Sequence, residues 1–167
     1  LSGGANYTLT NVTLSGQSQV GIDNAFPNPA APTNPRQRGT TGTVDLIDST
    51  LDGIAGDGIK TENGIFNIVN TTISNTNGNG IYAAGSNGAR LTLTNSVIQG
   101  SSSTGILADG NASIEVASSQ ILASAASGIE TVAGGTGAIS VTDSTVDGLL
   151  ADGTRTVNGA GIRMNST

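Results

Sequence analysis

The stretch LTLTNSVIQGSSSTGILA, residues 91–108, contains the pattern that decides the fold. It predicts a strand, a polar corner at Asn95, a second short strand through Ile98, a glycine turn, and a third strand that begins at Gly105-Ile106. The same order of residue types occurs six times along the chain. Repeats of this length indicate stacked structural units, each of which buries its apolar face against its neighbours.

The polar corner marks each repeat. Its six positions are Asn11, Asp48, Asn70, Asn95, Ser118 and Asp143. They are separated by 37, 22, 25, 23 and 25 residues, so four of the five intervals lie near one period. Asn and Asp side chains can bond to neighbouring backbone and stack as a polar ladder, which predicts a structural role for this corner.

Four apolar columns accompany the corner. Four residues before it come Tyr7, Val44, Phe66, Leu91, Ile114 and Ile139. Two residues before it come Leu9, Leu46, Ile68, Leu93, Val116 and Val141. Three residues after it come Leu14, Leu51, Ile73, Ile98, Ile121 and Val146. Further on, a glycine precedes each of Ile22, Ile59, Ile81, Ile106, Ile129 and Ile162. Alternation with a period of two places such residues on the inner face of a strand.

These columns predict an all-β solenoid of about six coils. Stacking places each aliphatic side chain on its equivalent one coil away, with the backbones about 4.8 Å apart. We expect the glycine before each isoleucine, as in Gly105-Ile106, to allow a positive φ where the chain bends between strands. No helix is required for this core.

The composition excludes several classes of protein. Twelve acidic and six basic residues give a net charge of −6, with no basic stripe of the kind that nucleic-acid binding requires. The chain has no cysteine and no histidine, which excludes disulfides, the usual zinc and copper sites, and serine–histidine or cysteine–histidine nucleophiles. No apolar run reaches the roughly 18 residues of a membrane span. We expect no cofactor and no metal.

The repeat resembles the right-handed parallel β-helix of the pectin-lyase-like superfamily, in coil length, in the Asn-rich corner and in the Gly-Ile strands. Handedness is implied by this resemblance. The coils GILADGNASIEVASSQILASAASGIETVAGGTGAISVTDS, residues 105–144, are similar in texture to passenger domains of autotransporters and to related bacterial surface adhesins. That similarity implies an extracellular or cell-surface location.

One insertion interrupts the solenoid, which otherwise forms a single segment over residues 1–167. A loop at about residues 25–42 contains every proline of the chain and is expected to leave the stack, because proline cannot donate to a strand ladder. It is either a tolerated insertion or a contact for another subunit or partner. The candidate contact residues are Phe26, Pro27, Pro29, Pro32, Pro35, Arg36 and Arg38.

Neither end resembles a cap. Exposed strand edges and apolar columns favour further stacking, so we expect the segment to belong to a longer solenoid or to be covered by other copies or partner subunits.

Polysaccharide lyases and hydrolases share the fold, so we ask whether any acidic residues of the chain match a catalytic arrangement. The sequence around Asp57 is only faintly similar to a hydrolase Gly-Asp-Asp segment, and Asp52 and Asp147 share a column four coils apart. Asp57, Asp109 and Asp152 stand in Gly/Ala-Asp-Gly sequences, for which a turn role is the preferred interpretation over a calcium site. No catalytic residue is assigned.

These observations predict a non-enzymatic extracellular β-helix, serving as an adhesin stalk, a surface structural protein or an assembly subunit. A glycan or another cell-surface ligand is a candidate partner. The first alternative is a carbohydrate-active enzyme or its glycan-binding module, which rests on fold analogy. The second is a subunit of an end-to-end filament.

Overall fold

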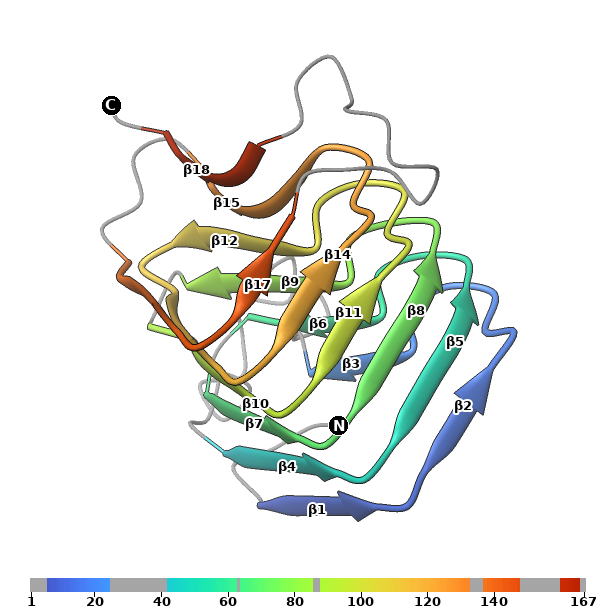
Figure 1. Cartoon of the computed structure of the whole chain (residues 1–167). Coiled ribbons are helices and arrows are strands. Elements are labelled where there is room, and N and C mark those ends of the chain that lie inside the picture. Colours follow the sequence, from blue (N-terminus) through green and yellow to red (C-terminus); the bar gives the residue numbers. More distant parts are fainter. Residues whose placement is uncertain are drawn as a thin grey trace, which may run out of the picture.

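The computed structural model describes residues 6–24, 42–62, 64–85, 88–132, 137–147 and 160–165. Within these ranges the chain contains strands and no helix. The strands form three six-stranded parallel sheets, which Figure 1 shows as three walls that rise from the blue first coil to the red last strand. The predicted all-β solenoid of six coils is confirmed.

Each coil contributes one strand to each sheet. The first sheet contains β1 (Tyr7–Thr10), β4 (Thr43–Ile47), β7 (Ile65–Val69), β10 (Arg90–Thr94), β13 (Ser113–Ala117) and β16 (Ile139–Thr142). The second contains β2 (Thr13–Ser15), β5 (Thr50–Ile54), β8 (Thr72–Thr76), β11 (Val97–Gln99), β14 (Gln120–Leu122) and β17 (Thr145–Val146). The third contains β3 (Ile22–Asn24), β6 (Ile59–Thr61), β9 (Ile81–Gly85), β12 (Ile106–Gly110), β15 (Ser127–Thr131) and β18 (Ala160–Met164).

The strand register reproduces all four predicted apolar columns. Leu91 pairs with Phe66 on one side and with Ile114 on the other, and Ile106 lies between Ile81 and Ile129. Side chains of these columns are almost completely buried in the central coils and form one continuous core. Because every column stacks on its equivalents in the neighbouring coils, aliphatic side chains fill most of the interior, with Phe66 as a fully buried aromatic member.

The first coil stacks on the second across the long insertion between them. β1 pairs with β4, β2 with β5 and β3 with β6, in the same register as the later coils. Residues 25–41 lie outside the described residues, as do all seven candidate contact residues of the proline-rich loop. Their proposed role stays a prediction.

The role expected of the glycines before the isoleucine column is wrong. None of them has a positive φ. A Cβ built on Gly105 would instead lie 2.5 Å from the carbonyl oxygen of Gly128, and one on Gly58 would lie 2.6 Å from that of Gly80. The coils approach so closely at this position that no side chain fits, and lack of space rather than backbone conformation requires glycine.

The left-handed positions lie at two other turns. All six predicted corner residues have φ between 48° and 56°. A second column lies at or just after the ends of β2, β5, β8, β11 and β14, with φ between 53° and 66° at Gly16, Gly53, Asn75, Gly100 and Ala123. Asn and Gly adopt this conformation readily, whereas Ala123 carries a Cβ penalty.

A ladder of hydroxyl groups, which was not predicted from the sequence, occupies the position directly after the polar corner in the second to sixth coils. Its members are Ser49, Thr71, Ser96, Ser119 and Ser144. Each hydroxyl accepts a hydrogen bond at 3.0–3.3 Å from the backbone N–H of the preceding coil. It donates to the carbonyl oxygen two residues before it at 2.7–3.0 Å. The ladder satisfies buried backbone groups where the strands are interrupted, at about 1 kcal/mol per bond.

Candidate interaction surfaces

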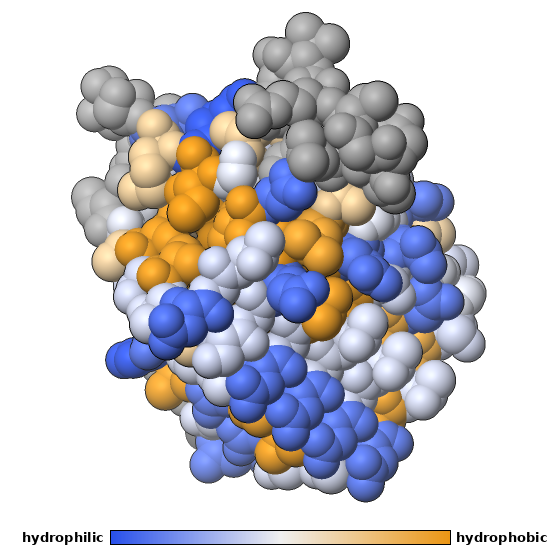
Figure 2. Space-filling model, viewed as in Figure 1, coloured by the Kyte–Doolittle hydropathy of each residue, from blue (hydrophilic) through white to orange (hydrophobic). Residues whose placement is uncertain are grey.

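The corner residues lie on the outside of the molecule, between the first and second sheets. Asn11, Asp48, Asn70, Asn95, Ser118 and Asp143 are all exposed. One side-chain bond joins neighbouring corners, from Asn70 Nδ2 to Asp48 Oδ1 at 3.1 Å. The visible surface in Figure 2 carries a hydrophilic band across its lower part and a hydrophobic patch nearer the β16–β18 end.

The second and third coils are joined by carboxylate–amide pairs in four columns, of which only the corner column was predicted from the sequence. The bonds run from Asn67 to Asp45 at 2.7 Å, Asn70 to Asp48 at 3.1 Å, Asn75 to Asp52 at 2.8 Å and Asn79 to Asp57 at 3.0 Å. Carboxylates stacked about 4.8 Å apart would repel by roughly 1 kcal/mol even in water. An amide at the next coil replaces that repulsion with a hydrogen bond. The recurring offset of 22 residues between Asp and Asn is the signal that could have revealed three of these pairs.

The hydrogen bonds between coils change the pKa of Asp52. Its carboxylate accepts bonds from Ser74 Oγ at 2.7 Å and from Asn75 Nδ2. These bonds, led by that from Ser74, lower the pKa of Asp52 below its ordinary value. A general acid requires the opposite shift, so Asp52 is suited to holding two coils together rather than to donating a proton.

The outer face of the third sheet has the most varied chemistry. One outward position per coil forms a column of Asp23, Lys60, Tyr82, Leu107, Glu130 and Arg163, which we name the lateral column. The four inner members are partly exposed. Apolar side chains therefore occupy the middle two coils, and charged side chains occupy the coils on either side.

Tyr82 is the centre of the best-defined contacts on this face. Its hydroxyl donates to Asp109 Oδ2 at 2.9 Å, and Lys60 Nζ lies 5.9 Å from the ring centroid. Lys60 also pairs with Glu62 at 3.4 Å. Partial burial, followed by the bond to Asp109, raises the pKa of Tyr82 to about 12. The phenol therefore remains a neutral hydrogen-bond donor over the physiological range.

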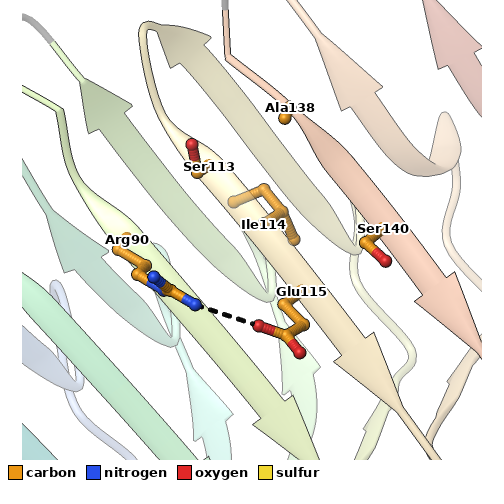
Figure 3. Close-up of a pocket in the computed structure, with 6 residues that line it drawn as sticks. All are labelled: Arg90, Ser113, Ile114, Glu115, Ala138 and Ser140. Carbon is orange, nitrogen blue, oxygen red and sulfur yellow. Dashed lines mark hydrogen bonds and ion pairs between the residues drawn. The ribbon is translucent and has the colours of Figure 1, made fainter.

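A shallow hollow of about 240 Å³ opens on the outer surface of the first sheet. Figure 3 shows its lining from β10, β13 and β16, with Arg90 paired to Glu115 at 3.2 Å across adjacent coils. Both side chains are at least half exposed, so this pair contributes little to stability. Ser113 and Ser140 supply hydroxyls, but no nucleophile–base pair is formed by the lining residues.

The remaining acids separate into different environments. Asp109 lies near the end of β12 and is the first residue of the turn that follows, because its carbonyl oxygen accepts the N–H of Ala112 at 3.4 Å. Asp57 precedes Gly58 between strands. Neither aspartate has a positive φ, and in the turn after β12 Gly110 adopts that conformation, with φ of 61°. Asp152 is outside the described residues. Asp52 and Asp147 belong to the second and sixth coils.

Over the part of the chain that the structure describes, no group of three or more acidic residues could hold a metal ion. Nor do those ranges contain a helix of the length and apolarity that a membrane crossing requires.

The fold and its surfaces define a parallel β-solenoid with polar, ion-paired lateral faces. A family model described as a right-handed β-helix region matches residues 37–167. The chain therefore belongs to the right-handed β-helix family, and the handedness implied by the resemblance is confirmed. The structure extends the helix before this match, because β1–β3 pair in register with β4–β6. No curated protein and no solved structure matches the chain.

Proposed function

We propose that this protein is a non-enzymatic structural β-helix of the cell surface, acting as an adhesin stalk, a surface structural protein or an assembly subunit. The observation that carries the proposal is the unbroken register of six coils in all three sheets. At about 4.8 Å per coil, the segment is a rod of roughly 29 Å whose bending would break backbone bonds in every sheet. Such a rod is suited to holding lateral surfaces at fixed spacings.

The use of the acidic side chains supports a structural role. The aspartates of the second coil accept hydrogen bonds from asparagines of the third coil. On the third sheet, Asp109 holds the hydroxyl of Tyr82. These carboxylates join neighbouring coils. Glycoside hydrolysis instead requires two acids that face each other across one substrate site, and these carboxylates do not converge on one hollow.

A turnover assay tests the non-enzymatic part of the proposal. The purified protein would be incubated with polyuronates and neutral glycans, and new reducing ends and unsaturated products would be measured against a heat-denatured sample. We expect no release above that control. Depolymerisation would overturn the proposal, and binding without turnover would favour the glycan-binding alternative.

Labelling of intact cells tests the location. An antibody raised against the purified chain should stain cells without permeabilisation, because the composition and texture resemble those of exported surface proteins. Staining that appears only after permeabilisation would place the protein inside the cell and remove the adhesive role.

The hydroxyl ladder argues against the alternative of an end-to-end filament. In the sixth coil Ile162 is 45% exposed, whereas Ile129 beneath it is fully buried, so the isoleucine column itself could accept a further coil. A second copy stacked in register by its first coil would, however, place Val12, which has no hydroxyl, where the N–H of Ser144 requires an acceptor of the ladder. Electron micrographs at high concentration should therefore show no long filaments, and regular filaments one solenoid wide would contradict this argument.

A further inference from the structure

The order of side chains in the lateral column is self-complementary. From the first coil to the sixth it reads acidic, basic, aromatic, aliphatic, acidic, basic, with the residues Asp23, Lys60, Tyr82, Leu107, Glu130 and Arg163. Reversing the order of the coils exchanges acidic with basic members and aromatic with aliphatic members. A surface with this property can pair with a second copy of itself.

A two-fold axis that lies between two such faces places each member of the column opposite its counterpart in the reversed order. If the axis runs along the strands, rotation keeps the strand direction and reverses the order of the coils. The first coil then faces the sixth of the other copy, the second faces the fifth, and the third faces the fourth. Tyr82 would meet Leu107 of the other copy, and Lys60 would meet Glu130. Because the arrangement is symmetric, each contact occurs twice.

We propose that the outer face of the third sheet is the interface of an antiparallel homodimer, centred on Tyr82 and Leu107. The centre supplies the apolar area, with an aromatic ring whose hydroxyl already has a partner in Asp109. The flanking charges supply orientation, because only the antiparallel arrangement places Lys60 opposite Glu130. The interface is lateral, so it is independent of the adhesive role and of any contact at the ends of the solenoid.

The local ion pairs are compatible with this arrangement. Lys60 Nζ lies 3.4 Å from Glu62, and Arg163 Nη1 lies 3.8 Å from Glu130. A second copy would extend each pair into a network across the interface. In the neighbouring outward column, Ala84 of one copy would face Asp109 of the other. The small side chain of Ala84 leaves room there for the hydrogen-bonded pair of Tyr82 and Asp109.

The size of the face limits the expected affinity. Six coils at about 4.8 Å, with two strands of about 10 Å and four of about 17 Å, give a face of roughly 420 Å², or about 840 Å² for both copies. This is smaller than a standard specific interface, so we expect a weak dimer with a dissociation constant of about 100 μM and a strong dependence on salt.

Charge reversal with complementation provides the test. Sedimentation velocity at low salt, from about 10 μM to about 1 mM, would follow the chain and its K60E and E130K variants across the expected affinity. Each reversal creates two like-charge contacts in a homodimer, so each variant alone should associate at least about tenfold more weakly. An equimolar mixture of the two variants should form a heterodimer, because both reversed contacts become attractive again.

The matched control is R90E on the first sheet, which reverses an exposed arginine that is likewise paired with a glutamate. It should dimerise like the unaltered chain, and circular dichroism would show that all variants remain folded. A monomeric chain at the highest concentration, association that K60E and E130K leave unchanged, or a mixture that stays monomeric would each overturn the proposal.

Discussion

Replacing Gly105 by alanine should destabilise the solenoid by about 3 kcal/mol. The new Cβ would lie 2.5 Å from the carbonyl oxygen of Gly128 and 2.9 Å from Ser124 Oγ, and it would also meet the side chain of Ile121. The carbonyl belongs to the backbone of the next coil and cannot rotate away, so the coils must separate locally.

The magnitude follows from the bonds at this position. Gly105 N–H donates to Ser127 O at 2.9 Å, and Gly105 O accepts from Ile81 N–H at 2.8 Å. Weakening two buried backbone bonds costs about 2 kcal/mol, and overpacking adds about 1–3 kcal/mol. Against this, alanine lowers the entropy of the unfolded chain, which recovers about 0.4–1 kcal/mol. The net loss is about 3 kcal/mol.

Urea unfolding followed by far-ultraviolet circular dichroism would measure the change, with Gly16 as the matched control. Gly16 has a φ of 63° and no atom within 4 Å of a Cβ built on it. Gly16→Ala should therefore cost only about 1 kcal/mol, and Gly16→Asn less, because asparagine tolerates the left-handed conformation. Gly105→Asn should be at least as damaging as Gly105→Ala. If Gly105→Ala is no worse than Gly16→Ala, close approach of the coils is not what requires glycine.

Three further changes test other parts of the structure. Ala123→Gly should stabilise the chain by about 0.5–1 kcal/mol in the same assay, because it relieves a left-handed alanine with φ of 53°. Ser96→Ala should destabilise it by about 1–3 kcal/mol, since Thr71 N–H loses its buried acceptor. Raising the pH above 10 should destabilise the fold, because the unfolded chain then loses the Tyr82 proton that the folded chain keeps until about pH 12. Asp109→Asn should reduce this alkaline destabilisation by removing the charge that opposes ionisation.

Each of these changes has a control elsewhere in the chain. Ala125→Gly, at a residue without positive φ, should be destabilising, and Ser102→Ala at an exposed position should be nearly neutral. For the pH experiment, Tyr7→Phe leaves Tyr82 as the only tyrosine, so absorbance at alkaline pH reports its ionisation directly. Glu115→Gln removes an equal charge from the first sheet and should leave the titration of Tyr82 unchanged. An unaltered titration in Asp109→Asn would contradict the role given to Asp109.

The sequence by itself determined the coil, its period and its core. Leu91, Leu93, Ile98 and Ile106 recur at fixed offsets from Asn95, and a solenoid converts such offsets into stacked positions because each coil repeats the path of the one before. The corner residues were equally predictable from the sequence, since Asn and Asp are among the few side chains suited to a left-handed turn. The contacts on the lateral faces could not be predicted in this way, because the residue types at outward positions differ from coil to coil and show no repeat.

Only the tertiary structure decided what lies against what between coils. It showed that Gly105 is required by the carbonyl of Gly128, that Ser96 accepts a bond from Thr71, and that Tyr82 meets Asp109. These partners are more than 20 residues apart in the chain and lie in neighbouring coils, so their distances depend on the register and spacing of the stack. A periodic sequence specifies which residues share a column, whereas the space and hydrogen bonds between columns exist only after the coils have packed.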